Sequence, residues 1–229
     1  MNILALDTTS SWGSVALSKE GKIVFLSYLD IRVTHSERIM QQIDHGLKQS
    51  ELGIDDIDLI ALSNGPGSFT GVRIGLATAK GICLAKKLPL YPVNTLKLLA
   101  YNAYGCQINI LPFIDARMDE VYAALYNKDL QEIIAPKSIK PIEFLDSIKE
   151  KTLILGDGIY KHKELINSMK DLLVAGQLHQ NYPVAAALIS IVSQEKKIPE
   201  YDLKKIAELE PYYLRKSQAE LKKSEREKI

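Results

Sequence analysis

The sequence has few of the residues that mark specialised classes of protein. Its 229 residues include only two cysteines, Cys83 and Cys106, which form no CxxC pair and no disulfide framework. We therefore expect two buried free thiols in a reducing compartment. Every apolar run is shorter than the roughly 18 residues that a membrane-spanning helix needs, so we expect no membrane association.

The sequence also lacks an excess of charge of either sign. Lysine and arginine together number 29 and aspartate and glutamate 28, which leaves a formal net charge of +1. Because no global field marks the surface as a nucleic-acid binder, a local patch or another subunit would have to supply most contacts to RNA phosphates. The start, Met1–Asp7, has no basic leader, and we expect a cytoplasmic protein.

The hydrophobic pattern predicts an α/β protein that opens with three strands. Residues 2–7, 12–18 and 22–29 have the pattern of short strands around turns, which indicates an antiparallel opening rather than the strand–helix start of a Rossmann unit. Further strands are predicted over 57–63, 90–93, 108–114, 121–126, 132–135 and 152–155, and helices over 35–50, 70–87, 96–104, 142–149, 161–173 and 183–195. The pattern restarts near Gly105, again with strands that end in acids, and this predicts two related lobes.

The most informative stretch is the glycine-rich segment Asn64–Gly75, NGPGSFTGVRIG. Glycine permits close backbone approach, and Ser68 and Thr70 can cap the following helix, whose free N–H groups could then hold an anion. A P-loop is excluded because Val72 and Arg73 stand where lysine and serine or threonine are required. The candidate anion- or nucleotide-binding residues are Asp7, Thr8, Gly65, Gly67, Ser68, Thr70 and Arg73.

The helix predicted over 70–87 carries two rows of small residues, each with a spacing of four. The first row is Gly71, Gly75, Ala79 and Cys83, and the second is Ala77, Gly81 and Ala85. Glycine inside a helix costs roughly 0.5–1 kcal/mol relative to alanine, so close packing must offset it. Packing against the protein's own sheet and packing against another subunit both explain such rows, and they can hold on different faces. Helical spacing selects a candidate partner interface of Ile39, Ile43, Leu47, Val72, Gly75, Leu76 and Ala79.

Five segments together resemble the TsaB (YeaZ) family in order and spacing, and they span nearly all of residues 1–160. They are Asp7–Ser10, Gly65–Gly75, Asn94–Leu96, Ile114–Arg117 and Gly156–Gly158. The glycine-rich segment is highly specific, whereas the others would be weak alone. The resemblance implies a two-lobed actin-like ATPase-domain fold (ASKHA, ribonuclease H-like). Its first lobe would hold residues 1–104 and about 183–215, its second lobe 105–182, and residues 216–229 would form a polar tail.

The resemblance also implies a role in tRNA modification. It implies a subunit required, with TsaD and TsaE, for transfer of a threonylcarbamoyl group to adenosine 37 of tRNAs that read codons beginning with A. The chain would form a heterodimer with a TsaD-like catalytic subunit, scaffold and activate it, and meet tRNA through the complex. No intrinsic cofactor is implied. ATP or ADP with Mg²⁺ at the complex interface, and a homodimer of the isolated chain, stay open.

The chain lacks the histidine pair with which the catalytic relative binds a metal. An HxxxH pair places two imidazoles on one helix face, but here Ile39 stands four residues after His35. We therefore predict neither catalytic residues nor a metal site. One alternative is an actin-like small-molecule kinase or ATPase that acts alone, with Asp7, Asp115 and Asp157 at an Mg–phosphate site. Another is a stand-alone homodimer with a structural or regulatory role.

Overall fold

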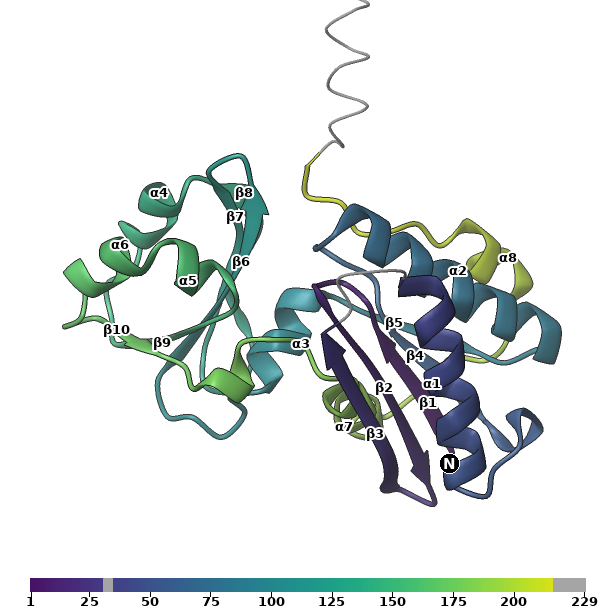
Figure 1. Ribbon diagram of the computed structural model, residues 1–229. Coiled ribbons are helices and arrows are strands. Elements are labelled where there is room, and N and C mark those ends of the chain that lie inside the picture. The colour runs from purple at the N-terminus through teal and green to yellow at the C-terminus, as the bar shows by residue number, and fades with distance from the viewer. Residues whose placement is uncertain (31–34, 216–229) are drawn as a thin grey trace, which may run out of the picture.

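The computed structural model describes residues 1–30 and 35–215, and these form two lobes that are each built on a five-stranded mixed sheet (Figure 1). The first sheet has the order β3-β2-β1-β4-β5, with β1 (Ile3–Asp7), β2 (Trp12–Lys19), β3 (Lys22–Asp30), β4 (Leu59–Ser63) and β5 (Leu90–Val93). The second has the order β10-β9-β6-β7-β8, with β6 (Asn109–Arg117), β7 (Glu120–Tyr126), β8 (Glu132–Ile139), β9 (Thr152–Leu155) and β10 (Leu173–Ala175). The predicted polar tail, 216–229, lies outside the described residues.

The two sheets have the same topology. In each, the first three strands pair antiparallel, the fourth pairs parallel with the first, and the fifth pairs parallel with the fourth. The prediction of two related lobes is therefore confirmed. Because β1 and β4 are central strands covered on both faces, all five residues of each are buried, which explains their nearly continuous apolar sequence.

Helices cover both faces of the first sheet (Figure 1). One face packs against α1 (His35–Gln49), α2 (Phe69–Lys86) and the short helix α8 (Leu203–Glu208), and the other packs against α7 (Ala185–Ser193). The chain thus returns to the first lobe after completing the second.

The second sheet is covered in the same way. Its outer face packs against α4 (Pro141–Leu145), α5 (Gly158–Lys161) and α6 (Lys163–Ser168), and its inner face packs against α3 (Thr95–Tyr101). Helix α3 also contacts α7 of the first lobe, so it lies between the two sheets and contributes Leu98 to the apolar cluster of the first lobe and Leu96 and Leu99 to that of the second. Two short 3-10 helices, Ile54–Asp56 and Leu178–Gln180, complete the described elements.

Three predicted elements differ from the structure. Within the range predicted as one helix, 161–173, α5 ends at Lys161, α6 covers only Lys163–Ser168, and Leu173 begins β10. The pairing of β10 with β9 is a non-local contact that local periodicity does not reveal. The helix predicted over 142–149 ends at Leu145. The strand predicted over 132–135 runs on to Ile139 through Pro136, which is tolerated because β8 is an edge strand.

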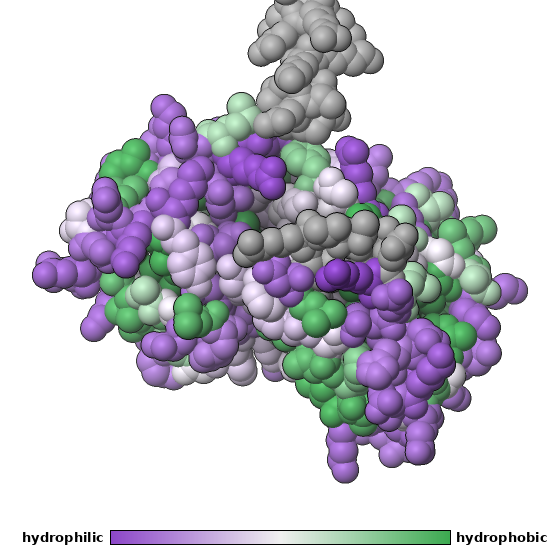
Figure 2. Space-filling model, viewed as in Figure 1, coloured by the Kyte–Doolittle hydropathy of each residue, from purple (hydrophilic) through white to green (hydrophobic). Residues whose placement is uncertain are grey.

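The surface is unevenly polar. Figure 2 shows a largely hydrophilic second lobe, whereas hydrophobic side chains gather over β3, where Ile23, Val24, Leu26 and Leu29 are exposed. Among the described residues no helix is long and apolar enough to span a bilayer. Of the two predicted buried thiols, Cys83 is buried but Cys106 is only partly buried, so the prediction was wrong for Cys106.

Candidate functional site

The glycine-rich segment lies directly against the turn that follows β1. A Cβ atom added at Gly67 would overlap the carbonyl oxygen of Thr9, and one added at Gly71 would overlap the carbonyl oxygen of Thr8. The Ser68 N–H donates to the Thr9 carbonyl at 2.7 Å, and the Thr8 hydroxyl donates to the Gly71 carbonyl at 2.7 Å. The glycines therefore let the first turn of α2 meet the backbone of Thr8 and Thr9.

This contact leaves little room for an anion at the start of α2. The Ser68 N–H is bonded to Thr9, and the Gly71 N–H donates to the Ser68 hydroxyl at 3.3 Å. The groups that face the segment from the turn are carbonyl oxygens, which repel phosphate. The structure brings Asp7, Thr8 and the segment together as predicted, but its geometry favours a packing role. Nucleotide binding here stays a prediction.

The second lobe repeats this arrangement with its own short glycine loop. A Cβ added at Gly156 or Gly158 would overlap the backbone of Phe113 in β6, the counterpart of β1. The Asp157 carboxylate accepts the backbone N–H of Asp115 at 3.0 Å. Burial raises the pKa of Asp157 to about 6, although these backbone hydrogen bonds favour the charged form. The loop–strand contact is thus a feature of both lobes.

Asp7 is the most unusual titratable group of the candidate site. It is 0 % exposed, one carboxylate oxygen accepts the Thr9 hydroxyl at 2.8 Å, and the other has no hydrogen-bond partner among the described residues. Burial raises its pKa to about 7, although the hydrogen bond from Thr9 favours the charged form. A cation would suit the unpartnered oxygen, yet the described part of the chain contains no group of three His, Cys, Asp or Glu side chains that could hold a metal.

The third predicted acid, Asp115, is engaged within its own lobe. Its carboxylate accepts the Arg117 N–H at 2.9 Å and pairs with the Lys161 ammonium at 3.2 Å. Asp115 and Asp157 lie together in the second lobe, where they share the hydrogen bond described above, whereas Asp7 belongs to the first lobe.

The residues predicted for a partner interface lie inside the first lobe. Six of the seven residues are buried and Leu47 is partly buried. Most of them pack against β1 and β4. The residues concerned are Ile39, Ile43, Leu47, Val72, Gly75, Leu76 and Ala79. The structure corrects this selection: helical spacing identified the apolar faces of α1 and α2, but those faces cover the protein's own sheet.

The second small-residue row of α2 points the other way. Ala77, Gly81 and Ala85 are exposed, and a Cβ added at Gly81 would meet no atom of the described residues within 4 Å. We call Ala77, Gly81 and Ala85 the outward row. Two large apolar side chains are exposed on the same pair of helices, Leu84 on α2 at 41 % and Met40 on α1 at 49 %.

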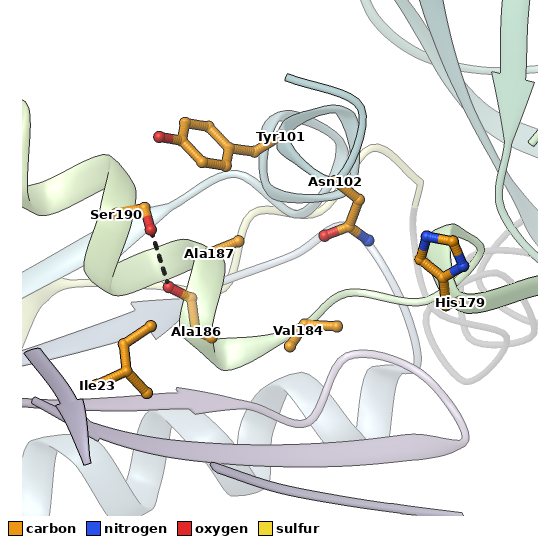
Figure 3. A pocket seen from close by; sticks show the side chains of 8 residues that line it. All are labelled: Ile23, Tyr101, Asn102, His179, Val184, Ala186, Ala187 and Ser190. Carbon is orange, nitrogen blue, oxygen red and sulfur yellow. Dashed lines mark hydrogen bonds between the residues drawn. The ribbon is translucent and has the colours of Figure 1, made fainter. Parts of the chain in front are cut away.

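A hollow of about 290 Å³ lies elsewhere, between β3, α3 and α7 (Figure 3). Its walls are mainly apolar, and the Asn102 and Ser190 side chains are engaged within the protein. The Asn102 amide donates to the carbonyls of Gln180 and Tyr182, and the Ser190 hydroxyl donates to the Ala186 carbonyl. No convergent polar groups mark this hollow as a reactive site.

Comparison with known proteins identifies the family. Residues 31–224 match the family described as TsaD, tRNA N6-adenosine threonylcarbamoyltransferase. The tRNA threonylcarbamoyladenosine biosynthesis protein TsaB of Bacillus subtilis is 30% identical over 239 residues, covering 100% of both chains. The chain belongs to the TsaB (YeaZ) family. The TsaB of Escherichia coli is 41% identical over 131 residues, which cover 56% of each chain.

Solved structures of this family share the fold. A Pseudomonas aeruginosa protein described as similar to the peptidase YEAZ superposes with a TM-score of 0.75 and 26% identity, covering 93% of this chain and 99% of the other. YeaZ from the same organism gives 0.71 and 28%, covering 84% and 92%. The chain therefore shares the two-lobed fold of these YeaZ structures, and family membership places it in tRNA threonylcarbamoyladenosine biosynthesis.

Proposed function

We propose that the chain is the non-catalytic subunit that is required, with a TsaD-like catalytic subunit and a TsaE-like ATPase, for threonylcarbamoyl transfer to adenosine 37 of tRNAs reading codons that begin with A. It scaffolds and activates the TsaD-like subunit and meets tRNA through the complex. The observation that carries this proposal is the outward row on α2.

Among the described residues, none packs against Gly81 closely enough to require a glycine there. Glycine at an exposed helical position costs about 1 kcal/mol relative to alanine, and the space beside Gly81 would accept a Cβ without contact. A partner helix that packs closely against α2 supplies the missing reason, because small side chains let two helix axes approach. Exposed Leu84 and Met40 add apolar surface for such a partner to bury.

The assignment of catalysis to the partner is supported by the surroundings of the candidate acids. Asp7 is fully buried, and Asp115 is held by Lys161. The HxxxH pair is absent from the sequence at His35, where Ile39 occupies the second position. These features favour a scaffold over an independent actin-like ATPase.

The substitution Gly81→Arg tests the outward row. We expect it to weaken binding to the TsaD-like subunit by about tenfold or more, because the arginine occupies space that a close partner backbone needs. Binding is measured by titration of the purified subunits, and modification by nucleoside mass spectrometry of tRNA. Ser168→Arg, at the exposed end of α6, is the matched control and should bind normally. Normal binding by a folded Gly81→Arg protein would eliminate this face as the interface.

An omission experiment tests the function as a whole. It combines threonylcarbamoyl-AMP synthase, the TsaD-like and TsaE-like proteins, ATP, threonine, bicarbonate and tRNA, with and without this chain. We expect the modified adenosine only when the chain is present. Equal product without it would refute the proposal, and Mg²⁺-dependent ATP turnover by the chain alone, lost in Asp7→Ala, would then favour the kinase or ATPase alternative.

A further inference from the structure

The last described residues, 209–215, run across the first lobe and reach the second; we call them the C-terminal strap. At the first lobe, the Tyr212 N–H donates to the Asn64 carbonyl at 2.8 Å. The Tyr213 ring stacks on Phe69 with centroids 4.8 Å apart, and its hydroxyl accepts the Arg73 side-chain N–H at 2.7 Å. The strap is thus attached to the first two turns of α2.

The fit between the strap and the glycine-rich segment is close. A Cβ atom at Gly65 would lie 2.6 Å from the Tyr212 carbonyl oxygen, and Gly65 has a φ of +110°, which other residues rarely adopt. Upstream, Leu209 packs on the first-lobe core, and the Lys80 ammonium of α2 donates to the Ala207 carbonyl at 2.8 Å. Helix α2 therefore contacts the strap at Tyr213 and also holds the end of α8, from which the strap continues.

The other end of the strap is attached to the second lobe. Leu214 packs against the apolar cluster shared by α3, β6 and β7. The Arg215 guanidinium, 16 % exposed, lies 3.4 Å from the Glu120 carboxylate and 3.5 Å from the Arg117 carbonyl. Glu120 is itself held by the Ser138 hydroxyl at 2.7 Å. The residue that pairs with Arg215 is therefore positioned by the second sheet.

We propose that the strap is a conformational coupling element that transmits the position of the second lobe to the first turns of α2. Tyr213 and Arg215 are separated by one residue, so their Cα atoms can be at most about 7 Å apart. Movement of Glu120 away from the first lobe must then break the Arg215 contact or pull Tyr213 from Phe69 and Arg73. The strap therefore keeps Glu120 of the second lobe and the first turns of α2 in one fixed arrangement.

The coupling reaches the proposed interface through Arg73. This residue stands four positions before Ala77 and so begins the helical row that continues as the outward row. A substitution of Arg215 would therefore alter the partner-binding face of α2, although Arg215 itself does not belong to the outward row. This consequence rests on the proposed function, whereas the coupling within the chain does not.

The coupling is tested by hydrogen–deuterium exchange on the isolated full chain. In Arg215→Gln and Glu120→Gln we expect the amides of residues 67–76 to exchange about threefold faster or more, because the strap that contacts α2 through Tyr213 loses its ion pair with the second lobe. Lys204→Gln, which removes an exposed ion pair with Glu208 on α8, is the control and should leave these amides unchanged. Unchanged exchange of residues 67–76 in both Arg215→Gln and Glu120→Gln would overturn the coupling.

A second measurement separates this inference from the proposed function. The TsaD-like subunit is titrated with wild-type chain and with Arg215→Gln, and we expect the variant to bind about threefold more weakly or worse. If the wild-type chain does not bind that subunit, the proposed function fails while the exchange result still decides the coupling. Faster exchange with equal affinity would overturn the transmission to the interface.

Discussion

Gly71→Ala is expected to lower the free energy of unfolding by about 3 kcal/mol or more, because the new Cβ atom would overlap the backbone carbonyl of Thr8. The opposing gain in helix propensity is only about 1 kcal/mol. Neither partner in the clash is a flexible side chain, so α2 must shift away from the turn after β1. The hydrogen bond between the Thr8 hydroxyl and the Gly71 carbonyl, 2.7 Å long, would then be strained as well.

Gly81→Ala provides the matched control on the same helix. The added Cβ meets open space, so we expect the free energy of unfolding to rise by about 0.5–1 kcal/mol. Urea unfolding of the three proteins, followed by circular dichroism, gives both values. If Gly71→Ala were as stabilising as Gly81→Ala, the close approach of α2 to the Thr8 backbone would be refuted.

The second large effect is a loss of stability with rising pH that is caused by Asp7. Burial raises the pKa of Asp7 from 3.8 to about 7, so over this interval the unfolded chain has released a proton that the folded chain retains. Unfolding then becomes more favourable as pH increases, and the effect levels off above the folded value. We expect Asp7 to lower the free energy of unfolding by roughly 2–4 kcal/mol between about pH 4 and pH 8.

Asp7→Asn removes this dependence because the amide is neutral at every pH. We expect the variant to be more stable than the wild type at about pH 8 and to differ little at about pH 4. Asp157, whose pKa burial raises to about 6, contributes a smaller slope of the same sign that persists in the variant. The control is Asp171→Asn, an exposed carboxylate, and the measurement is urea unfolding across the pH range. Identical slopes in wild type and Asp7→Asn would mean that folded Asp7 is charged at neutral pH.

Much of the secondary structure is readable from the sequence because it has local causes. The three opening strands, α1, α2 and β5 occur close to where periodicity, capping and turn residues predict them. The predictions weaken in residues 140–180, where α4, α5 and α6 are short and β10 has three residues. Elements of that length depend on tertiary contacts, so local patterns cannot define their limits.

The two rows of small residues on α2 are a pattern whose structural role cannot be predicted from the sequence alone. Spacing identifies both rows, but it does not tell which one faces the sheet. The structure places Gly71 and Ala79 on the face of α2 that packs against the sheet and Gly81 on the exposed face. The residues predicted for a partner interface therefore belong to the core of the first lobe. The contacts of Tyr213 and Arg215 were equally beyond prediction, because they join residues 140 and 95 positions apart.

The sequence by itself determined the family, the α/β class and the two related lobes, since these depend on a specific motif and on local hydrophobic alternation. Only the tertiary structure decided what that motif does. A glycine in the sequence indicates that something approaches the backbone closely. It does not indicate whether a ligand, a neighbouring strand or another protein fills the space. Here the carbonyls of Thr8 and Thr9 fill it at Gly71 and Gly67 and the Thr8 hydroxyl fills it at Gly75, whereas a Cβ at Gly81 would meet open space among the described residues.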